Sequence, residues 1–529
     1  MYANYVALSY CWGSRPQMRT LKANLQSHLS HIPIEDVSKT CKDSMLVTNG
    51  LGYEYLWIDA LCIVQDDERQ KGVEIAKMDQ VYRYAVLTIC AEGSPNAHAG
   101  LFPETPTDPR EVYPCEVTMS VQDEDKTVTR RLTLAGSRSG DDFLSKRGWT
   151  LQEEVLTSRA LVIGQGITSW RCATASASDT DPVLKPLPHE PFCDDDKDDD
   201  VFEYAIQRPR GLALEILRMR KWLYGLPGSH RMDSNHGIDA RHPALTAWYT
   251  LIEGYSDREL SFVQDTLPAV QGIATVLGSS LGTPYVKGLW LTDLPRGLLW
   301  YVAINDERNI LDSTSALQDE ARDISALNVP SWSWASVGKV RIRFCALRQA
   351  EEWTARSLAY ITMASPIGTE PQNHCQVLVR SPTQRALLVV DEAFARWRAS
   401  QTYGNRVACN HEGAYAQLYT KGVHPRFSAL IVTPSGIENE IIGEAVLDRP
   451  LDNHQQLPQM NSRGINILCL ALQLWEAGNT ASWACLLLQS TKANGEGYRR
   501  LGIGFIQPKN SWEWQKGMSA SSGETITVE

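Results

Sequence analysis

Residues 55–91 constrain the fold of this chain more than any other stretch of its sequence. Residues 56–64 and 85–91 are dense in Leu, Ile and Val, and a segment with helical spacing of apolar residues joins them. Neither run alternates polar and apolar residues, which is typical of strands buried on both faces of a parallel sheet. The stretch therefore predicts a strand, an acidic loop, a helix and a second strand, the βαβ unit of an α/β domain.

Two acids stand out in this unit. Asp59 lies within the first predicted strand, and Glu74 opens the predicted helix at the carboxyl end of that strand, where open α/β sheets bind their ligands. An acid inside an apolar strand needs hydrogen-bond partners, so Asp59 is either a structural hydrogen-bonding residue or part of a site. For Glu74, the helix dipole favours an acid in the first turn by roughly 0.3–1 kcal/mol, which accounts for it without catalysis. A catalytic role is the alternative.

Residues 5–10 predict a further strand, and three candidate binding residues follow its course. Ser9 lies at the carboxyl end of this strand, and Trp12 and Gly13 come directly after it. Gly13 permits a sharp turn or a close approach of the backbone to a ligand. The ring of Trp12 either stacks on a planar ligand group or closes the end of a hydrophobic core. A helix is predicted for residues 37–50.

The segment around residue 150 predicts another helix. Thr150 is expected to cap it, and Glu153 then stands at the position that completes a capping box, which is a purely structural role. Residues 161–170 predict a hairpin after this helix, whereas residues 96–140 before it are rich in predicted loops.

Changes in composition divide the chain into four parts. We expect an α/β domain, an acidic flexible linker, a helical segment and a β-rich C-terminal domain at residues 1–171, 172–200, 201–325 and 326–529, respectively. The linker contains the run DDDKDDD at residues 194–200, in which like charges repel one another. Such a flexible run offers no preorganised metal site.

Residues 329–336, VPSWSWAS, place Trp332 and Trp334 at strand spacing. A row of tryptophans either forms a ligand platform or is the core face of a strand, and the second interpretation is favoured here. Beyond residue 350, strand patterns dominate.

The composition argues against several classes of protein. No apolar run approaches the ~20 residues of a membrane span, and the N-terminus carries no export signal, so we expect no membrane span and a cytoplasmic location. The 12 cysteines are scattered without metal-binding spacing, which indicates reduced thiols and no metal site. A net charge of -11 opposes binding to phosphate backbones, so nucleic acid is not expected as a partner.

Four sequence blocks together resemble a known family. They are YVALSYCWG at residues 5–13, YLWIDALCIVQDD at 55–67, EIAKMDQVYRYAVLTICA at 74–91 and RGWTLQEEVLTSR at 147–159. In this order and spacing they resemble the fungal heterokaryon incompatibility (HET) domain over about the first 165 residues. Downstream stretches resemble the region that commonly follows this domain.

The resemblance implies a fold and a chemistry. HET domains act in nonself recognition and programmed cell death, and they are distantly similar to Toll/interleukin-1 receptor domains, which have a doubly wound, mainly parallel α/β fold. Some of those domains hydrolyse NAD with a glutamate, and by position Glu74 resembles that catalytic glutamate. Ser9, Trp12 and Gly13 are then expected to contact the base or ribose, while Asp59 orients neighbouring groups. A carboxylate suits this reaction because it stabilises the positive charge that develops on the ribose.

Three functions remain open at this level. The first is a cell-death effector that consumes NAD as substrate, without a bound cofactor, after self-association. The second is a non-enzymatic module that assembles with other incompatibility or signalling proteins. The third is a degenerate accessory protein.

Overall fold

The computed structural model describes residues 3–102, 142–179, 243–304 and 329–345, together with shorter segments between residues 115 and 134, 185 and 223, and 354 and 528. The chain divides into two compact units. Unit 1 comprises Met1–Asn235, Arg258–Leu260 and Pro268–Ser280, and unit 2 comprises His236–Asp257, Ser261–Leu267 and Leu281–Glu529. The acidic run at residues 194–200 lies outside the described residues.

Unit 1 is built on a seven-stranded mixed sheet with the order β2-β1-β3-β6-β7-β8-β9. The strands are β1 (Tyr5–Ser9), β2 (Tyr55–Trp57), β3 (Leu87–Cys90), β6 (Arg159–Ile163), β7 (Thr168–Cys172), β8 (Ala175–Ser178) and β9 (Lys185–Pro186). The first four in this order pair in parallel, and the rest pair antiparallel. The sheet is therefore mixed and not mainly parallel as predicted, because the hairpin of β6 and β7 and the strands after it continue it in antiparallel pairs.

The helices of unit 1 fall mainly between these strands. They are α1 (Leu25–Ser30), α2 (Lys39–Gly50), α3 (Asp59–Cys62), α4 (Glu68–Ile75), α5 (Met78–Tyr84), α6 (Gly148–Leu156) and the part of α10 (Pro268–Leu281) that belongs to this unit. A separate hairpin, β4 (Cys115–Asp123) and β5 (Lys126–Leu134), lies where the sequence predicted loops.

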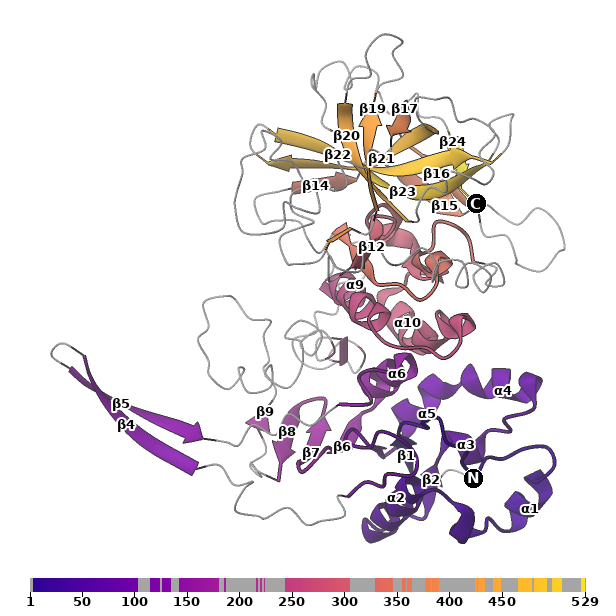
Figure 1. The fold of residues 1–529 in the computed structure, drawn as a ribbon, viewed down its shortest axis with the longest axis vertical. Coiled ribbons are helices and arrows are strands. Elements are labelled where there is room, and N and C mark those ends of the chain that lie inside the picture. Colours follow the sequence, from indigo (N-terminus) through magenta and orange to yellow (C-terminus); the bar gives the residue numbers. More distant parts are fainter. Residues whose placement is uncertain are drawn as a thin grey trace. The chain divides into compact units, whose positions relative to one another are not determined.

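Helices cover both faces of the sheet (Figure 1). Leu8 and Ile89 share a hydrophobic core with Cys41 of α2. Alternate residues face the other way, and there the Thr88 hydroxyl forms a 2.9 Å hydrogen bond with the hydroxyl of Thr157, directly after α6. Successive side chains of a strand point to opposite faces, so α2 and α6 lie on opposite sides of the sheet.

Two predicted elements of unit 1 begin elsewhere than expected. The strand predicted for residues 56–64 ends at Trp57, and Asp59 is instead the first residue of helix α3. An acid suits this position because its carboxylate accepts the Ala60 N–H at 2.6 Å. Helix α4 begins at Glu68 after the cap residue Asp67, so Glu74 stands in its last turn and does not open it.

Unit 2 contains helices near its start and a large sheet towards its end. Its helices and short strands are α9 (Pro243–Ser256), β10 (Tyr285–Val286), β11 (Leu289–Trp290), α11 (Leu294–Gly297), β12 (Trp300–Ile304), β13 (Ile342–Phe344) and β18 (His424–Pro425). The ten-stranded sheet consists of β14 (Thr354–Ser357), β15 (Tyr360–Met363), β16 (Val377–Arg380), β17 (Thr383–Val389), β19 (Phe427–Val432), β20 (Ile441–Leu447), β21 (Ile465–Ala477), β22 (Thr480–Ser490), β23 (Tyr498–Ile506) and β24 (Thr525–Val528). The C-terminal region is thus mainly β, as predicted.

Trp332 and Trp334 lie in the core but not on a strand. Both side chains are buried, and Trp334 begins a 3-10 helix, Trp334–Val337. The indole N–H of Trp334 donates to Gly288 O at 2.9 Å. The prediction of a core role is confirmed and the predicted strand is wrong, because the Ser333 hydroxyl accepts the N–H of Ala335 and so closes a turn.

No described helix combines the length and the apolar character needed to cross a membrane.

Candidate functional site

The C-terminal ends of β1 and β3 are where a sheet of this topology is expected to bind a ligand. With the order β2-β1-β3-β6, the connection after β1 leads to β2 on one side and the chain after β3 leads to β6 on the other, and doubly wound sheets bind ligands at such a switch point. A small cavity of about 20 Å³ lies there, which is room for about one water molecule. It is lined by Ser9, Cys90, Glu92, Leu144, Ser145, Thr150, Glu154, Val162 and Arg171.

Glu153 is the most unusual ionisable residue at this edge. It lies on α6, is buried, and accepts a hydrogen bond from the side chain of Ser9. Burial raises the pKa of its carboxyl from the ordinary 4.5 to about 7, although the Ser9 hydrogen bond and the charge of Arg147 oppose this. The Tyr82 hydroxyl also hydrogen-bonds to it. Glu153 is therefore poised to exchange a proton near neutral pH.

Asp59 is the second acid of the site. Trp12 Nε1 donates to its Oδ2 at 2.8 Å, and the hydroxyl of Tyr10 is a further hydrogen-bond partner. Burial raises the pKa of Asp59, while the charge of Arg147 and the hydrogen bond from Trp12 lower it. The charge of Asp59 in turn helps to raise the pKa of Glu153, so the two acids act on each other.

Arg147 is the cation that these two acids share. Its charge lowers the pKa of both Asp59 and Glu153. Its Nη1 donates to the carbonyl oxygen of Tyr10, directly after β1. The charges of Glu153, Asp59 and Arg147 thus act on one another near the carboxyl end of β1, an arrangement that can bind a proton or stabilise a developing positive charge.

The capping box predicted at Thr150 and Glu153 is wrong. Helix α6 begins at Gly148, and the Thr150 hydroxyl donates backwards to the carbonyl oxygens of Leu144 and Arg147, the latter at 2.8 Å. The Glu153 carboxyl turns towards Ser9 and away from the start of the helix. In the structure nearly all residues of α6, Glu153 among them, are buried.

The binding residues predicted from the sequence are partly brought together. Ser9 contacts Glu153 and lines the cavity, and Trp12 contacts Asp59. The ring of Trp12 also packs against the core on the α2 face, which agrees with the core-closing interpretation. Gly13 is exposed and has a φ of 75°, and a Cβ there would clash with the Cβ of Asn96. This glycine therefore permits a close approach of two loops.

Glu74 lies apart from this arrangement. Its carboxylate pairs with Lys77 at 3.3 Å, and about a third of its side chain is exposed, 34%. The contacts described for Glu74 do not join it to Ser9, Trp12 or Asp59. Its catalytic role stays a prediction from the resemblance.

The fold and the site define an α/β protein with a buried glutamate, Glu153, and a half-buried aspartate, Asp59, at the switch point of its sheet. Residues 5–153 match the family model described as Heterokaryon incompatibility protein (HET), so the chain resembles HET-domain proteins over this segment. The matched segment contains Ser9, Trp12, Asp59, Arg147 and Glu153. No curated protein and no solved structure matches the chain.

Proposed function

We propose that this chain promotes programmed cell death in fungal nonself recognition and that unit 1 does so by hydrolysing NAD. The family match over residues 5–153 supports a role of the heterokaryon incompatibility type. The hydrolytic step is inferred from the chemistry of the acid site and from the distant similarity of HET domains to Toll/interleukin-1 receptor domains.

The observation that carries this proposal is the environment of Glu153. A glutamate buried beside another acid costs stability, and a core position has no need of one. The side chain of Glu153 nevertheless lies near the C-terminal end of β1. It is hydrogen-bonded there to Ser9, which also lines the cavity. Perturbed acids at such a place are typical of catalytic sites.

The reaction needs few protein groups. The bond between the ribose C1′ and the nicotinamide nitrogen breaks, and neutral nicotinamide leaves with the bonding electron pair, so no acid has to protonate it. An ionised carboxylate of Asp59 or Glu153 stabilises the positive charge on the ribose. Water then adds to C1′ and releases a proton, which Glu153 can accept because its pKa is about 7. The products are ADP-ribose, nicotinamide and a proton.

The cavity has to widen before NAD can enter. Its volume of about 20 Å³ accommodates a single water molecule, whereas sites for drug-sized ligands measure about 300–1,000 Å³. We therefore propose that the described state is a resting state and that self-association opens the site. We expect NAD hydrolysis to increase steeply with protein concentration.

Substitution of single acids tests the enzymatic proposal. Intracellular NAD and viability are measured in cells that express the full chain, its Glu153→Gln variant, its Asp59→Asn variant or its Glu74→Gln variant. We expect Glu153→Gln to lower NAD consumption at least about 100-fold and to abolish killing. Killing by Glu153→Gln and Glu74→Gln at the level of the unchanged chain, with NAD constant, would refute hydrolysis.

Loss of activity in Glu74→Gln alone would instead assign catalysis to the glutamate that the resemblance indicates. Lys77→Gln is the matched control, because it breaks the ion pair of Glu74 and leaves the carboxylate in place.

A non-enzymatic interaction module is the second candidate function, and the edge of the sheet favours it. Among the described strands, β2 forms the edge next to β1 and has no further partner on its outer side. Tyr55 on this strand is exposed, as are Leu46 and Leu51 of the preceding segment. An exposed strand edge with apolar neighbours can add a strand from another chain. Killing without NAD loss would support this function.

A further inference from the structure

The start of α6 is held by an arginine that lies far beyond the family match. The side chain of Arg258 is 3% exposed, and its Nη2 pairs with Glu154 Oε2 at 3.5 Å. Its Nη1 donates to Arg147 O at 3.3 Å and to Thr150 Oγ1 at 3.2 Å. Arg258 thus contacts the residue that precedes α6 and two residues in its first two turns.

The backbone after Arg258 also supports α6. The first helical turn leaves N–H groups without partners inside a helix, and α6 has no side-chain cap. The N–H of Gly148 donates instead to Glu259 O at 2.8 Å, and the N–H of Glu259 donates to Lys146 O at 2.6 Å. On α10, the N–H of Gly272 donates to Gln152 Oε1 at 2.9 Å. The residues on both sides of Glu153 are therefore held from outside residues 5–153.

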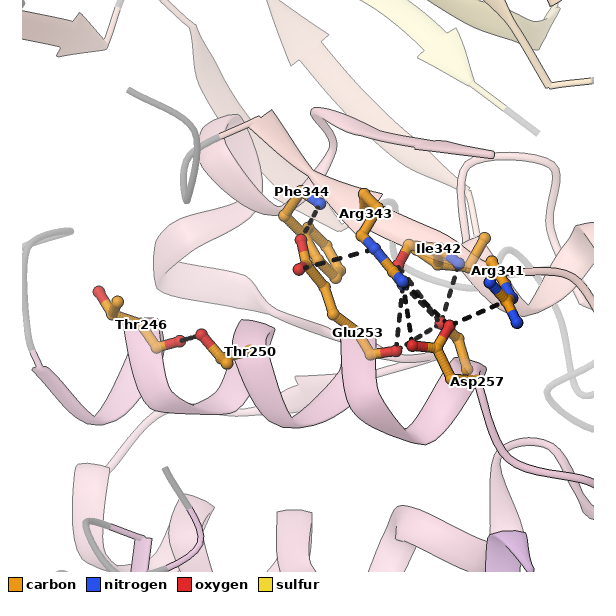
Figure 2. Close-up of polar contacts among 9 residues, drawn as sticks. Thr246, Thr250, Glu253, Asp257, Arg341, Ile342, Arg343 and Phe344 are labelled. Carbon is orange, nitrogen blue, oxygen red and sulfur yellow. Dashed lines mark hydrogen bonds and ion pairs between the residues drawn. The ribbon is translucent and has the colours of Figure 1, made fainter. Parts of the chain in front are cut away.

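The residue before Arg258 is anchored in unit 2. Both carboxylate oxygens of Asp257 accept from Arg343 Nη2 at 3.0 Å, and Arg341 lies 3.6 Å away (Figure 2). Arg343 also pairs with Glu253 of α9, whose carboxylate accepts the N–H of Phe344 at 2.7 Å. Asp257 and Arg258 are consecutive in the chain but belong to different units.

We propose that Arg258 is a positioning residue for Glu153 and that the Asp257–Arg258 step couples unit 2 to the acid site. Unit 2 sets the position of Asp257 through Arg343 and Arg341. The next residue, Arg258, then determines how well the first turn of α6 is ordered, through its contacts with Arg147 O and Thr150 Oγ1. The coupling itself does not depend on NAD, and only its effect on catalysis rests on the proposed function.

Hydrogen exchange of α6 in the full chain tests this coupling. We expect Arg258→Gln to speed exchange of the α6 amides about tenfold or more, because a buried arginine with three partners is lost. Arg258→Lys should restore part of the protection, since an ammonium can pair with Glu154 but cannot reach all three groups at once. Asp257→Ala, a change in unit 2, should speed exchange of α6 about threefold.

Two controls separate coupling from general destabilisation. Arg499→Gln removes an exposed side chain that donates to Gln489 in unit 2, and Lys77→Gln removes an exposed ion pair in unit 1. Neither should change exchange of α6, and exchange of β3 and β6 should stay unchanged in every variant. Unchanged α6 exchange in Asp257→Ala would refute the coupling, and unchanged exchange in Arg258→Gln would refute the positioning role.

The pKa of Glu153, measured through the pH dependence of stability, distinguishes a positioning role of Arg258 from a purely structural one. Asp59, Tyr82 and Arg147 act on Glu153, and the charge of Glu153 in turn acts on Cys11 and Cys90. Because burial is the main cause that raises the pKa of Glu153, a loosened α6 should admit water and lower that pKa. In the Arg258→Gln background, the stabilisation gained by adding Glu153→Gln should therefore be smaller and should level off at a lower pH. If the stabilisation by Glu153→Gln has the same size and the same pH range with and without Arg258→Gln, the positioning role is contradicted, whether or not the protein hydrolyses NAD.

Discussion

At the scale of single residues, the chain keeps an acid where an apolar side chain would be more stable. Glu153 is buried, and its neighbours Ser9 and Tyr82 offset only part of the cost of burial, because the pKa stays raised. Sites that serve function commonly carry such a cost. The cost can be measured through the pH dependence of stability.

We predict that Glu153→Gln stabilises the protein at pH 8 and not at pH 4.5. The folded carboxyl has a pKa of about 7 against an ordinary 4.5, so the native state binds more protons between these pH values. Stability of the unchanged chain therefore falls as pH rises from about 4.5 to about 7, by about 3 kcal/mol at most. Glutamine loses no proton, so the variant should be about 1–3 kcal/mol more stable at pH 8.

Urea unfolding at the two pH values measures this difference. Glu74→Gln is the control, since it changes an exposed glutamate of the same unit, and it should alter the free energy of unfolding little at either pH. Equal effects of Glu153→Gln at pH 4.5 and pH 8 would show that Glu153 is not a strained acid.

At the scale of elements, α10 packs against two helices of unit 1 through a glycine. A Cβ on Gly272 would lie 2.6 Å from the Cβ of Asp79 on α5 and 2.6 Å from Oε1 of Gln152 on α6. Contacts this short force the neighbours apart, and the hydrogen bond from the Gly272 N–H to the side-chain oxygen of Gln152 would be strained as well. Close packing at this position therefore depends on the absence of a side chain.

We predict that Gly272→Ala destabilises the protein by about 1–3 kcal/mol. Gly72→Ala on α4 is the matched control, because nothing lies within 4 Å of a Cβ there. That change should be neutral or stabilise by up to about 1 kcal/mol, since alanine favours a helix. Thermal unfolding of both variants measures the difference, and equal melting temperatures would contradict the packing described for α10.

The elements that local patterns specify were predicted from the sequence, and those that distant contacts specify were not. Strand β1, helix α2 and the hairpin of β6 and β7 follow directly from apolar spacing and turn residues. The start of α6 was placed wrongly because its first N–H is satisfied by Glu259, more than a hundred residues away. Because Glu259 takes the place of a capping side chain, a local capping rule assigns Glu153 the wrong role.

The candidate site was predicted in part for the same reason. Ser9 stands at a strand end that the sequence located and contacts Glu153, and Asp59 was singled out as an acid in an apolar run although it begins α3. Glu74 was chosen through the expectation that it opens a helix, whereas Asp67 caps α4 seven residues earlier.

At the scale of the whole molecule, the chain leaves unit 1 and returns to it. Residues Arg258–Leu260 and Pro268–Ser280 belong to unit 1, although residues of unit 2 precede, separate and follow them. The family match ends at residue 153, so the structural unit is larger than the matched segment.

We predict that a fragment of residues 1–171 does not retain a stable α6. It lacks Glu259, which satisfies the first helical N–H, and it lacks Arg258 and Gly272, which contact the same helix. Hydrogen exchange of α6 amides should be at least about 100-fold faster in the fragment than in the full chain. Equal protection in both would show that the returning segments are dispensable.

The thiol of Cys90 lines the cavity at the end of β1, so opening of the cavity can be followed by the reaction of this thiol with an alkylating reagent. Burial raises the pKa of Cys90 to about 12, so the closed protein holds almost no thiolate there and alkylating reagents should react with it very slowly. We predict that Cys90 becomes alkylated at least about tenfold faster under conditions that activate the protein, as mass spectrometry of the labelled peptide can measure. The rate of alkylation at this one cysteine would then report how often the site opens, before any substrate has been identified.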